Sequence, residues 1–386
     1  MEIATTTAIK EQKRRLVLGY IYRHRHASRQ DLAQALPISP PTITQNLNDL
    51  EDSGLIKRSG FLDSNGGRRA QIYSFDQTAR IAIGVEILGS SVALQAYDLY
   101  GERLAGRTHM IDYDNGDEYY EAVAGHVNDF IEAIAAKLSV DESSILGVAF
   151  AVQGIVSPDG SHLTFGMILG NTGLTLSRLS ERIPHPCRLI HDSHASAIAE
   201  LWLDDAIANA TCIYLDEHVG CAVISDGQIN EGENLRNGTC EHMTLAIDGP
   251  ECYCGQRGCM DVYTSRAALL DDSGCDSLAE FFSRAHDGDD DCARRLDRYL
   301  TYLAHAIKNA RTVLSNDVII GGRIAYLMSD DDFAALRKKT DAIASFPDDR
   351  FAIIRSVCSQ GQNILGAALS YIKPFLDEEI DTRARR

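Results

Sequence analysis

The sequence predicts an α/β protein with an N-terminal winged helix-turn-helix over residues 1–76, followed by a bilobal domain over residues 77–386. Within the first 76 residues, hydrophobic positions change from helical spacing to alternation, and two similar series of strands and helices follow. The charge shifts at the same point. Residues 1–76 carry 11 basic and 8 acidic side chains, a net +3, whereas the remainder carries 26 and 47, a net −21.

Three helices are predicted in the N-terminal domain. The first covers residues 10–25, where apolar side chains recur at helical spacing between arginines. Ser28 is expected to cap a short second helix over residues 29–36. Ser39 is expected to cap the third, residues 42–53, because two prolines follow it in the opening turn, where missing amide hydrogens cost little.

The third helix has the composition of a DNA recognition helix. An apolar stripe of Ile43, Leu47 and Leu50 faces the domain core, and small or amide side chains suited to base edges and phosphates occupy other positions. The candidate DNA contacts on this helix are Ser39, Thr42, Thr44, Gln45, Asn46 and Asn48.

A hairpin follows, with alternating residues 55–58 and 71–75 joined by a polar tip. Gly67, Arg68 and Arg69 lie in that tip, and arginines suit the negative potential of a DNA minor groove. We therefore expect a DNA-binding wing. The alternative is a three-helix protein–protein module with a surface hairpin.

The most specific motif lies in the second half of the chain, with the spacing H-x9-C-x-C-x4-C. One imidazole and three thiolates supply the donors of a tetrahedral zinc site, and two glycines between them allow the backbone to turn. The predicted Zn²⁺ ligands are His242, Cys252, Cys254 and Cys259.

Two other interpretations of these cysteines remain open. They are a disulfide with a spare thiol, and reduced core residues, although Cys-x-Cys spacing is poor disulfide geometry. Cys240 is the residue best placed to replace a ligand. The other six cysteines, including Cys187, Cys212, Cys221 and Cys358, stand singly among apolar neighbours, which is typical of reduced core residues.

The acidic domain contains two successive units of similar order, which predicts two lobes around a central cleft. The first unit has strands at 81–88, 92–97, 103–110 and 145–152 and a helix at 119–138. The second has strands at 212–215 and 220–225, a helix at 293–314 and a buried strand with a glycine pair at 318–322.

Together with the zinc motif, this order resembles the ROK family of repressors, open reading frames and sugar kinases. The resemblance covers nearly the whole chain, and Cys-x-Cys-Gly-x-x-Gly-Cys is its most specific part. It implies an actin/hexokinase-like, ribonuclease H-like bilobal domain and a sugar bound in the cleft. Asp192 matches the catalytic aspartate of the family's kinases.

The resemblance also implies the other ligand-binding residues. His191 stands where the kinases have Asn, Thr239 where they have Glu, and Asp261 where a Glu follows the last zinc cysteine. His242 completes the set. The alternatives are that Asp192 only caps a helix, and that Thr239 and Asp261 are surface residues or neighbours of the zinc ligands.

The nucleotide-binding loops depart from the kinase pattern. Leu88 replaces a glycine of the first phosphate loop, and Asp216 and Glu217 place negative charge in the second. We therefore expect a protein that is not an enzyme, in which Asp192 binds a ligand instead of catalysing phosphoryl transfer.

The resemblance implies a repressor of carbohydrate-metabolism genes that binds an inverted-repeat operator as a homodimer or a tetramer, with a sugar or sugar derivative as effector. One alternative is an active ATP-dependent sugar kinase with a fused DNA-binding domain. A second is a repressor controlled by a partner protein or by metal supply. No apolar run approaches the roughly 18 residues of a membrane span, so we expect a soluble, cytoplasmic protein.

Overall fold

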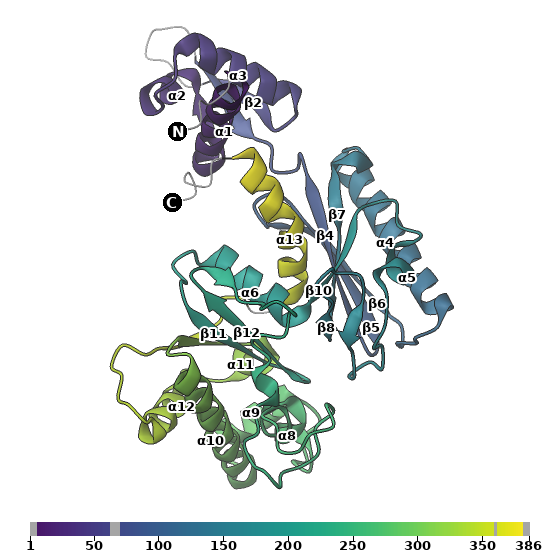
Figure 1. Cartoon of the computed structure of the whole chain (residues 1–386), viewed down its shortest axis with the longest axis vertical. Helices are drawn as coiled ribbons and strands as arrows, with labels where there is room; N and C mark the ends of the chain where they lie inside the picture. Colours follow the sequence, from purple (N-terminus) through teal and green to yellow (C-terminus); the bar gives the residue numbers. More distant parts are fainter. Residues whose placement is uncertain (1–5, 62–69, 359–360, 381–386) are drawn as a thin grey trace.

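The computed structural model describes residues 6–61, 70–358 and 361–380. It places the winged helix-turn-helix at one end of the molecule and two sheet-containing lobes beyond it, and α13 runs from the first lobe towards the N-terminal domain (Figure 1). The predicted fold class is confirmed. None of the described helices combines the length and apolar character needed to cross a membrane.

The N-terminal domain contains the predicted helices and hairpin. Its elements are α1 (Thr6–His24), β1 (His26–Ser28), α2 (Arg29–Ala35), α3 (Pro40–Asp52), β2 (Ile56–Phe61) and β3 (Gln71–Phe75), with sheet order β1–β3–β2. Ser28 caps α2 in a capping box, because its hydroxyl accepts the Asp31 amide while the Asp31 carboxylate accepts the Ser28 amide. Ser39 precedes α3, but its hydroxyl contacts the Thr42 hydroxyl at 2.9 Å and caps no backbone amide.

The first lobe has a sheet of order β10–β7–β4–β5–β6. Its elements are β4 (Ile81–Leu88), β5 (Ser91–Tyr97), β6 (Arg103–Met110), α4 (Asp117–Leu138), η1 (Glu142–Ser144), β7 (Ile145–Val152), β8 (Ile155–Val156), β9 (Leu163–Phe165), α5 (Leu176–Ser180), β10 (Cys187–His191) and α6 (Asp192–Leu203). Val85 and Phe150 of the sheet and Val127 of α4 are buried in one core.

The second lobe repeats this pattern, with order β13–β12–β11–β14–β15. Its elements are β11 (Ala210–Leu215), β12 (Val219–Ser225), β13 (Gln228–Ile229), η2 (Cys240–His242), α7 (Asp261–Thr264), α8 (Arg266–Leu270), α9 (Leu278–His286), α10 (Asp290–Val313), β14 (Asp317–Gly321), α11 (Gly322–Leu327), α12 (Asp330–Ile343) and β15 (Ile353–Arg355). In both lobes, two antiparallel pairings lie next to two parallel ones. In each lobe a helix begins directly after a parallel strand, α6 after β10 and α11 after β14.

The last helix, α13 (Gln362–Glu379), joins the lobes to the N-terminal domain. It crosses α6 closely enough that a methyl group added at Gly366 would lie 1.6 Å from the Ala195 carbonyl oxygen. Its apolar face, including Leu369 and Leu376, is buried in one continuous cluster with Leu18 of α1 and other residues of the N-terminal domain. The DNA-binding domain therefore packs against α13 through a shared core.

Polar contacts hold the same junction. Arg14 of α1 forms an ion pair with Glu379 at 2.8 Å, and Arg15 donates to the carbonyl oxygen of Ile380 at 2.9 Å. Tyr22 stacks on Tyr100 of the first lobe with ring centroids 4.6 Å apart. Because these contacts surround an apolar interface, they fix the orientation of α1 on the lobe.

Candidate metal centre and ligand cleft

The four predicted metal ligands come together. One ligand atom from each of His242, Cys252, Cys254 and Cys259 lies within 4.8 Å of the others. His242 Nδ1 is 3.8 Å from Cys252 Sγ, and Cys254 Sγ is 3.7 Å from Cys259 Sγ. A tetrahedral zinc with Zn–S bonds of about 2.3 Å separates neighbouring ligands by about 3.8 Å, so the residues fit that ion.

The loop that carries the cysteines depends on glycine. Gly255 and Gly258 have φ of +85° and +69°, and a methyl group at Gly258 would lie 1.7 Å from the Ala246 carbonyl oxygen. Cys252, Cys254 and Cys259 form no disulfide in this structure. Cys240 lies outside the ligand group and its thiol pairs with that of Cys221.

A small cavity of about 60 Å³ lies between the lobes, next to the metal ligands. Its walls include His191 and Asp192, at the junction of β10 and α6, and Glu241 and His242 of η2. Asp192 is the first residue of α6, and its carboxylate accepts the Ser193 amide at 2.7 Å. The structure thus brings three predicted ligand-binding residues, His191, Asp192 and His242, to one cleft.

Burial sets the charge of this cleft. It raises the pKa of Asp192 to about 6, and it lowers the pKa of His191 to about 3, which leaves that imidazole neutral. Burial also raises the pKa of Glu241 well above its ordinary value. Within the described chain, His191 Nδ1 and Glu241 Oε2 are buried and have no hydrogen-bond partner. Polar atoms left in this state are typical of a site that binds a hydrogen-bonding ligand.

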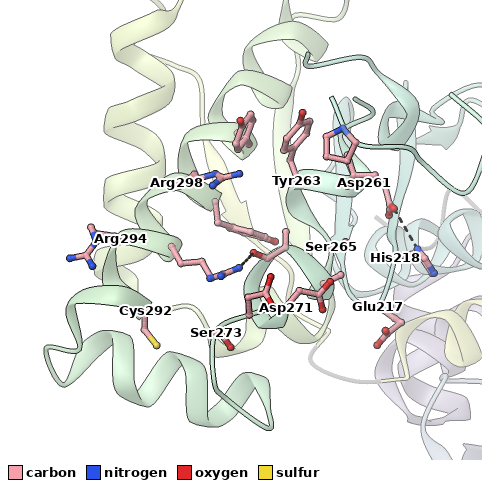
Figure 2. A pocket seen from close by; sticks show the side chains of 18 of the residues that line it. Glu217, His218, Asp261, Tyr263, Ser265, Asp271, Ser273, Cys292, Arg294 and Arg298 are labelled. Carbon is pink, nitrogen blue, oxygen red and sulfur yellow. Dashed lines mark hydrogen bonds and ion pairs between the residues drawn. The ribbon is translucent and has the colours of Figure 1, made fainter. Parts of the chain in front are cut away.

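Asp261 and Thr239 differ from the prediction. Asp261 is buried, accepts the Val219 amide at 2.7 Å and lies 3.5 Å from His218 Nδ1, the pair joined by a dashed line in Figure 2. Asp261 lines a second, larger cavity of about 970 Å³ instead of the cleft. Thr239 lines neither cavity, and its hydroxyl donates to the Arg236 carbonyl. In this structure neither residue lines the cleft, and both side chains form hydrogen bonds with backbone groups.

The turn between β11 and β12, predicted to repel phosphate by its negative charge, is in fact neutralised by arginines. Asp216 accepts hydrogen bonds from the Arg323 amide at 3.3 Å and from its Nε at 2.7 Å, and Glu217 lies 3.6 Å from Arg266. The repulsion that the sequence suggested is compensated. Arg323 lies in the first turn of α11, and its side chain binds the Asp216 carboxylate.

The predicted DNA-binding face is only partly correct. Ser39, Gln45 and Asn48 are exposed, and Thr42 and Thr44 are half-buried. Asn46 is 1% exposed, so it cannot contact DNA from this position. Its place three residues after Ile43 and four before Leu50 puts it on the buried stripe of α3, a signal that helical spacing already contained. Gly67, Arg68 and Arg69 lie outside the described residues.

Comparisons with known proteins agree with this architecture. A family model described as the ROK family matches residues 82–373, and one described as the MarR family matches residues 14–70. The chain belongs to the ROK family. This ROK protein is 22% identical over 385 residues to the xylose repressor of Bacillus subtilis strain 168, covering 98% of this chain and 99% of that protein.

It is also 25% identical over 272 residues to the DNA-binding transcriptional dual regulator NagC of Escherichia coli K12, covering 69% of this chain and 66% of NagC. A solved ROK family transcriptional regulator, described as a homolog of the E. coli MLC protein, superimposes with a TM-score of 0.74 at 19% identity and covers 96% of this chain and 98% of its own. A ROK family glucokinase from Streptomyces griseus, solved with glucose and AMPPNP, gives 0.63 at 17% identity, with coverages of 75% and 98%. Both structures show the shared fold.

Most of the residues that line the cleft were not predicted as ligand contacts in this ROK chain. Glu241, His218 and Tyr253 line the cavity, and the Tyr253 hydroxyl lies 3.4 Å from His242 Nε2. His218 and Tyr253 also line the larger cavity, so they form the wall between the two. Glu241 precedes a metal ligand and Tyr253 lies between two of them, which is the signal that sequence reasoning had available.

Proposed function

We propose that this ROK protein is a repressor of carbohydrate-metabolism genes that binds an inverted-repeat operator as a homodimer, with its operator affinity set by a sugar or sugar derivative in the cleft. The relatives named as repressors and the MarR-type match support this proposal. Exposed amide and hydroxyl side chains on α3, including Gln45 and Asn48, supply groups that can read base edges.

The single observation that carries the proposal is the position of α13. One part of this helix crosses α6, whose first residue is Asp192 in the cleft, and its far end packs against α1 of the DNA-binding domain. A ligand that displaces α6 therefore acts on an element that directly supports the DNA-binding domain.

The ligand acts through a difference in affinity between two arrangements of the lobes. Asp192 comes from the first lobe and Glu241 and His242 from the second, so a hydroxyl-rich ligand that bonds both sides favours one inter-lobe angle. A ligand that prefers the arrangement suited to the operator acts as a co-repressor, and one that prefers the other acts as an inducer.

We further propose that His242, Cys252, Cys254 and Cys259 hold Zn²⁺. A bound zinc would supply a structural cross-link that fixes the loop following η2. With Nδ1 of His242 directed at the cysteines, its Nε2 is left facing Tyr253 and the cleft. The same imidazole then takes part in both the metal centre and the ligand site.

The proposal excludes sugar phosphorylation as the main activity. The charge of Asp216 and Glu217, in the turn that corresponds to a phosphate loop of the kinases, is balanced by Arg323 and Arg266, so this exclusion depends on the first loop. Leu88, at the first loop, ends β4 and pairs with Ser91 across a two-residue turn. The first loop therefore carries a branched side chain at the position where the kinase loop has a glycine.

The test uses the full-length, zinc-loaded protein. A preferred duplex is first selected from a random DNA library, and its affinity is then measured by fluorescence anisotropy in the presence of a panel of pentoses, hexoses, amino sugars and sugar phosphates. We expect one compound to change the operator affinity by about tenfold or more, a coupling of roughly 1.4 kcal/mol. Asp192→Asn should abolish this response and keep operator binding.

Asp205→Asn, an exposed carboxylate just beyond α6, is the matched control and should respond like the parent protein. Failure to select any duplex would refute the repressor. Operator binding that no sugar alters would favour control by a partner protein or by metal supply. ATP-dependent phosphorylation of a sugar that Asp192→Asn abolishes would establish the kinase instead.

A further inference from the structure

Two cysteines outside the metal centre lie next to each other. Cys275 belongs to the loop before α9, and Cys292 belongs to the first turn of α10, yet their sulfur atoms are 3.8 Å apart. The prediction that cysteines outside the zinc motif stand singly is therefore wrong for this pair. Chain folding across α9 brings them together, and no sequence spacing indicates it.

A guanidinium group is held beside the pair. Arg284 of α9 donates from Nη1 to Cys275 Sγ at 3.5 Å, and its Nε and Nη2 donate to the Asp289 carboxylate at 3.0 and 2.7 Å. Asp289 is also the N-cap of α10 and accepts the Cys292 amide. The arginine is therefore held with its guanidinium group against the Cys275 sulfur.

The two thiols differ in their surroundings. Cys275 is half-buried, whereas Cys292 is buried at 2% exposure and burial raises the pKa of its thiol to about 11. Cys292 also lines the large cavity, where Figure 2 shows its sulfur on the first turn of α10. Small molecules that enter this cavity of about 970 Å³ therefore come next to Cys292, whereas Cys275 is partly exposed on its own loop outside the cavity lining.

We propose that Cys275 and Cys292 are a redox modification site that forms a reversible disulfide with hydrogen peroxide. Isolated buried cysteines are inert, but reactive ones are partly exposed and lie near a second thiol, and Cys275 meets both conditions with a guanidinium in contact. A disulfide needs its sulfur atoms about 2.05 Å apart, and Cys275 lies in a loop that can move towards the helix. This site does not depend on the proposed regulatory function.

The reaction balances in two steps. The Cys275 thiolate attacks one peroxide oxygen, the O–O bond breaks, and the departing hydroxide takes up a proton and leaves as water, which leaves a sulfenic acid on Cys275. The Cys292 sulfur then attacks the Cys275 sulfur, the S–O bond breaks, and the departing hydroxide takes the Cys292 proton to form a second water. The two sulfurs together lose two electrons, and the peroxide gains them.

The disulfide would tether one wall of the large cavity. Asp271, Asp272 and Ser273, just before Cys275, line this cavity together with residues of α10. The cross-link joins their loop to the start of α10 and closes a covalent ring around α9. It therefore restricts the cavity without involving the cleft residue Asp192.

The test treats the reduced, zinc-loaded, full-length protein with increasing hydrogen peroxide, followed by alkylation of free thiols and peptide mass mapping. We expect a peptide in which Cys275 and Cys292 are cross-linked and two hydrogen atoms have been lost. This peptide should appear before zinc is released and should disappear when dithiothreitol is added. In Cys292→Ser, dimedone should trap a sulfenic acid on Cys275. Cys187→Ser, the matched control, should leave the cross-link unchanged.

Arg284 supplies a second, independent measurement. Arg284→Ala should slow formation of the cross-link by about tenfold, because the guanidinium that contacts Cys275 Sγ is lost, and Arg284→Lys should restore part of the rate. Two results would overturn the site: both thiols remain reduced after peroxide has released the zinc, or Cys275 cross-links to a cysteine other than Cys292.

Discussion

Replacing Gly366 by alanine tests whether the crossing of α13 and α6 supports the protein. The new methyl group would lie 1.6 Å from the Ala195 carbonyl oxygen, whereas ordinary contacts begin at 3.4 Å. The three nearest atoms all belong to the backbone of Ala195 in α6, so no side chain can rotate away, and the cost should reach the upper end of about 1–3 kcal/mol for overpacking. Removing a helical glycine returns about 1 kcal/mol. We therefore expect a net destabilisation of about 2 kcal/mol.

The assay is urea unfolding of the zinc-loaded protein, followed by tryptophan fluorescence. The chain has one tryptophan, Trp202, near the end of α6, so its emission reports the packing of that helix. Gly125→Ala is the matched control, because this glycine lies within α4 with nothing within 4 Å of an added methyl group, and it should raise stability by about 1 kcal/mol. A Gly366→Ala protein as stable as its parent would refute the close crossing and weaken the proposed route from the cleft to the DNA-binding domain.

Three other predictions test the metal centre, the cleft and the DNA-binding face. Cys254→Ser should lower the zinc content measured by mass spectrometry and reduce stability, whereas Cys187→Ser should retain the metal; full occupancy in Cys254→Ser would exclude that ligand. The pKa of Asp192 is about 6 in the folded protein and about 4 in the unfolded chain. Because the folded state disfavours the ionised carboxylate, the free energy of unfolding falls as pH rises from 4 to 6. Asp192→Asn should therefore be more stable than the parent above pH 6, by on the order of 1 kcal/mol, and equal to it near pH 4 in parallel unfolding series; the opposite trend would contradict the burial of this carboxyl. Gln45→Ala should weaken operator binding by about 1–3 kcal/mol in anisotropy titrations, whereas Asn46→Ala should leave the base preference unchanged, and a changed preference would return Asn46 to the interface.

The sequence predicted the features that depend on neighbouring residues. Helical spacing and capping residues located α2 and α3, and alternation located β2 and β3, because a local hydrophobic period records which side of an element is buried. The metal ligands were found for a similar reason. Three of the four lie within eight residues of the chain, so the turn that brings them together is itself local.

What only the tertiary structure decided are the contacts between distant segments. Asp261 meets His218 across 43 positions, and Asp216 meets Arg323 across 107, so neither pair leaves a pattern in a local window. The same holds for the packing of α1 against α13, at opposite ends of the chain. A sequence period shows that a side chain is buried, but the partner that it meets depends on how the whole chain closes, which only the folded structure determines.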